Sequence, residues 1–311
     1  DRRRARQLHS GSLTASADGR RVESSEVGVI PMLSRNGDAP IEGTSPVAWP
    51  GAPSWPPQQG PERHAMSRRL IGVGVGPGDP DLLTLKAHRI VSTADVVLVP
   101  ATEASGDGPG RAERVLAAAC PEASSRIVRV PFSMSDRSGV TARRAAAWQT
   151  SAAVACDAFE TGADVVAFAT VGDPSVYSTF SYLADAVLER FGDVEVEVVP
   201  GITAMQALAA ASRTPLVEGD ERLGLVPVKR GVGDLAALGA EADTIVAYKI
   251  GRHYAELREY VDRLGEDAEA IVGINVGTPE QVIGSPADFD EVPYFGTMII
   301  TGRRAQRGGR L

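Results

Sequence analysis

The sequence predicts an α/β protein with two domains. From residue 70 to residue 211, short apolar runs alternate with helical segments. Strands separated by helices of this length require right-handed crossovers, so the first sheet is expected to be parallel. After residue 214, further strands follow with fewer helices between them, which favours a smaller, mixed sheet. Of the 311 residues, 43% are hydrophobic, which permits one large domain or two modest domains with cores of their own.

The first domain is expected to span residues 66–213. Its strands are expected at residues 70–75, 96–100, 127–130, 165–168 and 194–199, and its helices at residues 82–93, 111–119, 140–161, 180–190 and up to residue 211. The second domain is expected to span residues 214–303. Its strands are expected at residues 223–228, 244–248, 270–276 and 294–301, with a helix at residues 254–264.

The two ends of the chain differ in composition from the rest. Residues 1–65 are rich in arginine at the start and then in glycine, serine and proline, so they offer little apolar surface to offset the entropy of ordering. We expect a disordered or extraneous tail there. Met66 opens the stretch MSRRLIGVGVG, and a chain that begins at Met66 is expected to fold. The basic, glycine-rich residues 304–311 are expected to fray.

Two strand ends carry the same turn chemistry. The stretch AFATVGDPSVYSTF runs from an apolar strand into Gly172, Asp173 and Pro174, and LIGVGVGPGDPDLLTLK repeats the pattern around Gly76 and Pro77. In open α/β sheets, ligands bind just past the carboxyl ends of the strands. Gly172 lets the backbone approach a ligand closely, and Pro174 fixes the loop in advance of binding. The sequence therefore predicts a ligand site at these two turns.

The spacing of the glycines excludes two phosphate-binding motifs. Counting from Gly72 and Gly74, the third glycine of a dinucleotide fingerprint would stand where the chain has Pro77. The same stretch leads to no Gly-Lys-Ser/Thr, so it is not a Walker motif either. A loop of backbone carbonyls with one carboxylate suits a cationic or polar ligand better than a pyrophosphate.

Composition and residue usage exclude several classes of protein. The net charge of -8 argues against a general nucleic-acid binder. Cys120 and Cys156 stand in alanine-rich helical stretches, so buried thiols are expected rather than a disulfide framework or a zinc site. No apolar run approaches the length of a membrane span, and a cytoplasmic location is the simplest interpretation. No nucleophile–base pair is found, and His88 is expected to be solvated or packed rather than catalytic.

Five motifs in order, GVGPGDPDLLTLKA, VGDPSVYSTF, VVPGITA, TIVAYKIGR and AIVGINVGT, together resemble the tetrapyrrole (corrin/porphyrin) methylases, which use S-adenosylmethionine. The likeness covers residues 69–302. Within that superfamily the chain is most similar to the precorrin-2 C(20)-methyltransferases, because Gly-Asp-Pro-Ser is followed by Val-Tyr-Ser-Thr-Phe. The resemblance implies the two-domain tetrapyrrole methylase fold, with a parallel Rossmann-like sheet domain followed by a smaller mixed-sheet α/β domain, and with cofactor and substrate bound between them.

The resemblance also implies an activity, in which a methyl group passes from S-adenosylmethionine to the C-20 meso carbon of precorrin-2, giving precorrin-3A and S-adenosylhomocysteine in cobalamin biosynthesis. No metal is required, and a homodimer is expected. Close alternatives are methylation of cobalt-precorrin-2 or uroporphyrinogen III, and other superfamily members such as the diphthine and ribosomal-RNA methylases. A non-catalytic nucleotide-binding module is a more distant alternative.

Carried over from the family, the cofactor contacts are Pro77, Val171, Gly172, Asp173, Val176, Thr203, Ala204, Tyr248, Lys249 and Gly277. No general base is identified; the candidates for a catalytic role are Asp173, Tyr177 and Lys249. Lys249 stands where uroporphyrinogen methylases commonly carry methionine. Because a second positive charge beside a sulfonium is unfavourable, its amine is expected to point elsewhere, either to a substrate carboxylate or to solvent.

The substrate implied by the resemblance carries many carboxylates, so its site should offer cations. Candidates are Arg213, Lys229, Arg230, Arg252 and His253. Each alone is more often a solvated surface charge, and a cluster would be informative. For Asp173, the sequence leaves open whether the carboxylate serves the turn or the cofactor; Asp173→Asn is expected to leave thermal stability nearly unchanged in both cases, since asparagine supports the same local turn.

Overall fold

The computed structural model describes residues 68–102, 106, 108–132 and 141–304, which lie within the compact unit Pro53–Leu311. The tail expected at residues 1–65 lies outside the described residues, and so do residues 305–311. Arg304 is described, and its guanidinium is held by Glu221, with Nε 2.9 Å from Oε1 and a terminal nitrogen 2.7 Å from Oε2. Among the described residues, none of the helices combines the length and apolar character needed to cross a bilayer.

The first sheet is parallel throughout, as predicted. Its strands lie in the order β3-β2-β4-β1-β5 and are β1 (Arg69–Gly74), β2 (Val96–Thr102), β3 (Ile127–Phe132), β4 (Val165–Thr170) and β5 (Glu195–Val199). β1 and β4 are neighbours, and Gly74 pairs with Thr170 at their last residues. The two turns singled out in the sequence therefore begin side by side at the carboxyl edge of the sheet.

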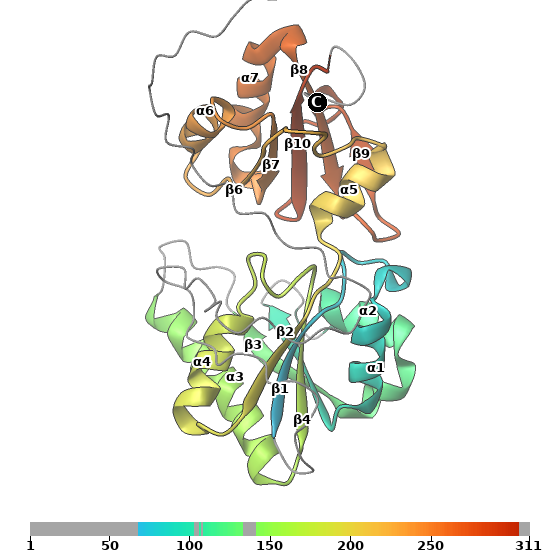
Figure 1. The fold of residues 1–311 in the computed structure, drawn as a ribbon, viewed down its shortest axis with the longest axis vertical. Coiled ribbons are helices and arrows are strands. Elements are labelled where there is room, and N and C mark those ends of the chain that lie inside the picture. Colours follow the sequence, from blue (N-terminus) through green and yellow to red (C-terminus); the bar gives the residue numbers. More distant parts are fainter. Residues whose placement is uncertain (1–67, 103–105, 107, 133–140, 305–311) are drawn as a thin grey trace, which may run out of the picture. The chain divides into compact units, whose positions relative to one another are not determined.

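Helices cover both faces of this sheet (Figure 1): α1 (Leu85–Thr93) and α2 (Arg111–Ala119) lie on one face, and α3 (Ala142–Glu160) and α4 (Phe180–Arg190) lie on the other. The alternation of side chains along β1 fits this arrangement, because Ile71 and Val73 pack in the core of α1 and α2, while Leu70 packs with α3 and α4. α1 starts at Leu85, later than predicted, because the Thr84 hydroxyl caps it and a 3₁₀ segment, η1 (Pro80–Leu82), precedes it.

The second sheet is mixed, as predicted. Its strands lie in the order β6-β7-β10-β8-β9 and are β6 (Leu223–Pro227), β7 (Thr244–Tyr248), β8 (Ala268–Ile274), β9 (Val282–Gly284) and β10 (Gly296–Gly302). β6 runs parallel to β7, and the other pairs are antiparallel. α6 (Gly233–Gly239) and α7 (Tyr254–Leu264) bury Leu235 and Leu257 on one face, and α5 (Ala204–Ser212) buries Leu208 against Ile299 on the other.

Candidate active site

Three glycine-containing turns meet backbone to backbone at the carboxyl edge of the first sheet. These glycine turns lie at the carboxyl ends of β1 (Gly74 and Gly76), β4 (Gly172) and β5 (Gly201). The N–H of Gly172 donates to the carbonyl of Gly76 at 2.7 Å, and the N–H of Gly76 donates back to Gly172 at 3.3 Å. A Cβ added to Gly74 would lie 2.6 Å from the backbone nitrogen of Gly201, and one added to Gly201 would overlap the carbonyl oxygen of Gly172. No side chain fits between these turns, so they form a rigid backbone surface of the kind that a close-lying ligand needs.

Asp173 joins two of these turns through its carboxylate, which is 8% exposed. Its Oδ1 accepts hydrogen bonds from the backbone N–H of Ser175 at 2.7 Å and from the Ser175 hydroxyl. Its Oδ2 accepts from the N–H of Gly201 at 2.9 Å, a residue 28 positions along the chain. Both oxygens are therefore engaged by the protein, one within the local turn and one across to Gly201. A contact of Asp173 with a cofactor stays a prediction.

Residues of the second sheet reach the same turns. Gly277 has φ +80°, and a Cβ added there would lie 2.9 Å from Cγ of the buried Pro77. The Tyr248 hydroxyl accepts the backbone N–H of Met205 at 2.9 Å, close to Thr203, which caps α5. Through these contacts the structure brings together the following predicted cofactor residues: Pro77, Gly172, Asp173, Thr203, Ala204, Tyr248 and Gly277.

The two remaining apolar residues of the predicted cofactor set support the turn at Gly172. Val171 packs against the core that underlies α1 and α2. The N–H of Val176 donates to the carbonyl of Asp173 at 3.2 Å and so closes the turn. Their contact with a cofactor stays a prediction.

Tyr177 and Lys249 stand next to Tyr248. The Tyr177 ring lies edge-on to that of Tyr248 with 5.7 Å between centroids, and the Lys249 Nζ lies 5.0 Å from the Tyr177 ring centroid. Tyr177 and Lys249 both adopt left-handed backbone conformations, with φ of 52° and 60°. Burial raises the pKa of both tyrosines, so their hydroxyls stay protonated and neutral at physiological pH. The Lys249 amine thus lies over the ring of a neutral tyrosine. This contact by itself favours the charged amine, whereas burial and neighbouring charges oppose it.

Lys249 belongs to a cluster of positive charge. Burial, followed by the charges of Lys229 and Arg144, lowers the pKa of Lys249 from 10.5 to about 8. Arg144 lies on α3. Burial raises the pKa of Tyr294, and the charge of Arg144 opposes that rise. Arg144 was not predictable from the sequence, because nothing in the stretch ARRAAAW distinguishes it from a solvated helix residue. We refer to Lys249, Lys229 and Arg144 as the cation cluster.

The other predicted substrate residues are placed differently. The His253 ring nitrogens lie 2.9 Å from a Glu256 carboxylate oxygen and 3.3 Å from the Lys229 carbonyl oxygen, so His253 adjoins the cluster. Arg230 and Arg252 are exposed at the surface. Arg213 follows the last residue of α5 with φ 58° and lines a surface hollow of about 420 Å³ formed by residues 206, 209, 210 and 213–217. Arg213 therefore lies in the hollow at the end of α5, and no hydrogen bond or ion pair among the described residues links it to the glycine turns.

Arg111 links α2 to the second domain and was not predicted from the sequence. One of its terminal nitrogens donates to the Asn275 side-chain oxygen at 2.8 Å, and its guanidinium lies 4.1 Å from the Phe295 ring centroid. Burial lowers its pKa, and its Nε is buried without a hydrogen-bond partner among the described residues. Asn275 has φ 50°, a conformation that asparagine tolerates, and this was the signal available in the sequence GINVGT.

The family model of the Tetrapyrrole (Corrin/Porphyrin) Methylases matches residues 69–288. The chain belongs to this family. The match confirms the predicted superfamily, and it includes both sheets up to β9 and the turns described above. The two-domain α/β fold is confirmed with it.

Two curated relatives of this methylase differ in how much of their length it covers. The chain is 35% identical over 241 residues to the cobalamin biosynthesis protein CobIJ of Mycobacterium tuberculosis, a match covering 76% of the chain and 46% of the relative. The chain thus spans about half the length of that protein. It is 32% identical over 241 residues to the precorrin-2 C(20)-methyltransferase of a Sinorhizobium species, covering 75% of the chain and 95% of that relative.

Among solved structures, the methylase is similar to the uroporphyrin-III C-methyl transferase of Thermus thermophilus in complex with S-adenyl homocysteine. The sequence identity is 26% and the TM-score is 0.52, and the match covers 75% of this chain and 97% of that structure.

Proposed function

We propose that the chain transfers a methyl group from S-adenosylmethionine to the C-20 carbon of precorrin-2, giving precorrin-3A and S-adenosylhomocysteine in cobalamin biosynthesis. The observation that carries this proposal is the cation cluster, because Lys249 lies over the ring of Tyr177, which follows the Gly172 turn, and its three cations suit an acceptor that bears several carboxylates. The match to nearly the whole of the Sinorhizobium C(20)-methyltransferase supports the position that is methylated.

The glycine turns fit the donor. S-adenosylmethionine supplies a methyl group on a positively charged sulfur. Methyl transfer to carbon requires that this methyl group lie in line with the nucleophilic carbon, so much of the acceleration comes from positioning. The surface formed by Gly74, Gly172 and Gly201 has no side chains that could hold the donor at a distance, and Asp173 fixes it before binding. We assign to the donor the predicted cofactor residues that these contacts bring together.

The cation cluster fits the acceptor. Burial, followed by the charges of Lys229 and Arg144, disfavours the charged form of Lys249 in the free protein. Carboxylates of a tetrapyrrole would offset this effect and raise the pKa of Lys249 again. Lys249 would then bind the acceptor and not the donor, because a second positive charge beside the sulfonium is unfavourable.

Incubation with methyl-labelled S-adenosylmethionine tests the reaction directly. Precorrin-2, cobalt-precorrin-2 and uroporphyrinogen III are offered separately, and the mass and labelled position of each product are determined. One methyl group at C-20 of a precorrin-2 acceptor is expected. Transfer to uroporphyrinogen III alone would favour that alternative, and binding of the donor without transfer to any tetrapyrrole would favour a non-catalytic module.

The cation cluster is tested with the variants Arg144→Gln and Lys249→Met. A charge-assisted hydrogen bond contributes about 1.5–3 kcal/mol, so each variant should raise the KM for the tetrapyrrole by roughly tenfold or more. The KM for S-adenosylmethionine should change much less. The neighbouring exposed Arg143, changed to Gln, is the matched control on α3. Equal effects of Arg144→Gln and Arg143→Gln would contradict the role of the cluster.

A further inference from the structure

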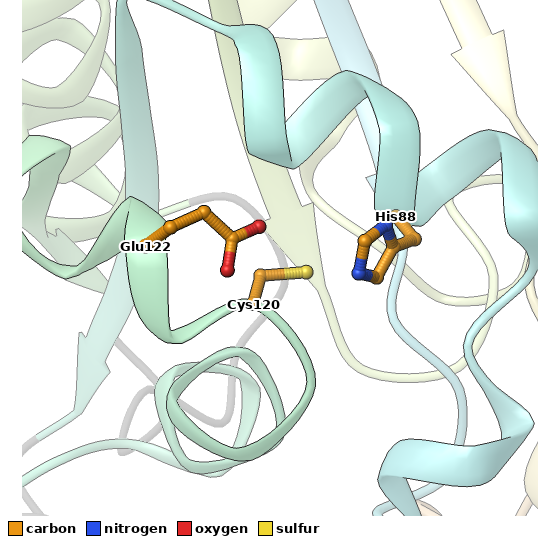
Figure 2. Close-up of side chains that lie close together, drawn as sticks. All are labelled: His88, Cys120 and Glu122. Carbon is orange, nitrogen blue, oxygen red and sulfur yellow. The ribbon is translucent and has the colours of Figure 1, made fainter.

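Three side chains with metal-binding atoms converge away from the glycine turns. His88 lies on α1, Cys120 ends α2, and Glu122 lies in the 3₁₀ segment η3 (Pro121–Arg126). One ligand atom from each, an imidazole nitrogen, the thiol sulfur and a carboxylate oxygen, lies within 4.8 Å of the other two. Figure 2 shows the Cys120 sulfur pointing toward the His88 ring, with the Glu122 carboxylate turned to the same place.

The backbone around these residues is held in place by packing and hydrogen bonds. Arg126 donates from one terminal nitrogen to the carbonyl of Ala94 and from the other to the carbonyls of Ser92 at 3.0 Å and Glu122 at 3.4 Å, so it ties η3 to the end of α1. Ala94 and Ala123 are fully buried in the core between these elements. The cluster therefore stands on two elements whose relative position is fixed.

Ser92 holds the Glu122 carboxylate in position. It lies one turn after His88 on the same side of α1, and its hydroxyl donates to Oε1 of Glu122. This bond orients the carboxylate and leaves Oε2 for another partner. Among the described residues, the His88 ring has no hydrogen-bond partner, so its nitrogens are available as well.

The combination of thiolate, imidazole and carboxylate suits Zn²⁺ and metals of similar preference better than Mg²⁺ or Ca²⁺, which take oxygen ligands. Zinc bonds of about 2.0–2.3 Å place tetrahedral ligand atoms about 3.6 Å apart, so the side chains must close by about 1 Å to share one ion. His88 and Glu122 are exposed and can rotate toward the fixed, buried Cys120. Three protein ligands leave a fourth position for water.

We propose that His88, Cys120 and Glu122 bind one divalent transition-metal ion of the zinc class, separately from the proposed methyl-transfer site. The place in the fold supports the separation. η3 comes just before the first residue of β3 and α1 ends just before β2, so the cluster lies toward the amino ends of the strands, whereas the glycine turns lie at their carboxyl ends. An ion there joins α1 to η3 and stabilises the first sheet domain.

Binding exchanges a proton for the metal. The Cys120 thiol loses its proton to solvent as the sulfur–metal bond forms, while an imidazole nitrogen of His88 and a carboxylate oxygen of Glu122 donate lone pairs. A thiol proton is therefore released when the ion binds. Affinity should therefore fall as the pH is lowered.

The test is titration of the full reduced chain with Zn²⁺, and with Co²⁺ as a spectroscopic substitute. One ion per chain is expected, with a thiolate-to-cobalt charge-transfer band, proton release and a rise in melting temperature. Outer-shell partners contribute about 10–100-fold to metal affinity, so Ser92→Ala should weaken binding by about tenfold and His88→Ala by at least that much. Cys120→Ser should abolish the charge-transfer band.

Cys156 provides the matched control, because it is the other buried free cysteine and lies on α3. Cys156→Ser should keep the cobalt band and the affinity of the unaltered protein. Absence of one-to-one binding, a band that persists in Cys120→Ser or disappears in Cys156→Ser, or an affinity unchanged in His88→Ala would each overturn the proposal. His88 is exposed on a helix, so His88→Ala remains informative even if Cys120→Ser does not fold.

Discussion

Replacement of Asp173 by asparagine tests how the glycine turns are joined. In the structure, Oδ1 accepts from the N–H of Ser175 at 2.7 Å and Oδ2 accepts from the N–H of Gly201 at 2.9 Å. Asparagine offers one acceptor oxygen and one NH₂ group, so in either orientation one of these N–H groups faces a donor. A buried group left without its partner costs about 1–3 kcal/mol, and we expect Asp173→Asn to lower the free energy of unfolding by that amount.

The measurement is chemical denaturation followed by circular dichroism. Asp79→Asn is the control, because Asp79 caps its own turn by accepting the N–H of Asp81 at 2.9 Å, a bond that asparagine can also accept. Its stability should change by less than about 0.5 kcal/mol. Equal stabilities of Asp173→Asn and Asp79→Asn would refute the reasoning, because they would show that the bond to Gly201 contributes nothing.

Four further predictions concern stability, the chain ends and assembly. Gly277→Ala should destabilise the fold by more than about 1 kcal/mol in denaturation, and by more than Gly162→Ala, because both glycines have positive φ but the added Cβ meets Pro77 at Gly277 and open space at Gly162. The pKa of Lys249 is about 8 in the folded chain and the ordinary lysine value is 10.5, so between these pH values the unfolded chain binds more protons and the free energy of unfolding rises with pH. Lys249→Met should be more stable than the unaltered protein at pH 7, and its free energy of unfolding, measured against pH, should lack this rise. A chain beginning at Met66 should unfold cooperatively and bind S-adenosylmethionine in calorimetry as the full chain does, since both described sheets follow it, and loss of either property would contradict this. A homodimer is expected from light scattering at micromolar concentration, since apolar side chains of the second domain are exposed, and a monomer there would count against it.

The sequence predicted the larger elements well because their signals are local. Helices α2, α4 and α7 have the predicted bounds, since each shows an apolar period and begins or ends at a clear polar or glycine boundary. α6 and β9 were missed. α6, with the sequence GDLAALG, has seven residues, and β9 has three, so neither is long enough to show the apolar periodicity of a helix or a strand.

The parts of the candidate site that could be predicted are the turns formed by consecutive residues. The pairing of Gly76 with Gly172 follows from two adjacent strands with equivalent turns, and the sequence pattern placed both. The bond from Asp173 to Gly201 was not predictable, because it depends on β5 lying on the other side of β1. The expectation that Asp173→Asn leaves stability nearly unchanged considered only the local turn, and the bond to Gly201 predicts a loss of stability instead.

Long-range contacts also explain the residues that were missed. Arg144 meets the charge of Lys249 from a helix more than a hundred positions earlier, and Arg111 meets Asn275 across 164 positions. Cys120 was correctly predicted to be buried, but its neighbour His88 comes from a different helix. No spacing within one segment could signal these pairs.

Lysine at position 249 is best explained by the acceptor of the proposed reaction. In the free protein, its charge is disfavoured by burial and by Lys229 and Arg144, so the site holds repulsion that lowers stability. S-adenosylmethionine has a net positive charge, so it offsets that repulsion less than a polycarboxylate does. A polycarboxylate relieves it and in doing so raises the pKa of Lys249 again, so that acceptor binding near pH 8 takes up protons and weakens as the pH rises further. In the proposed reaction, Lys249 would therefore couple acceptor binding to pH, and the backbone turns would hold the donor.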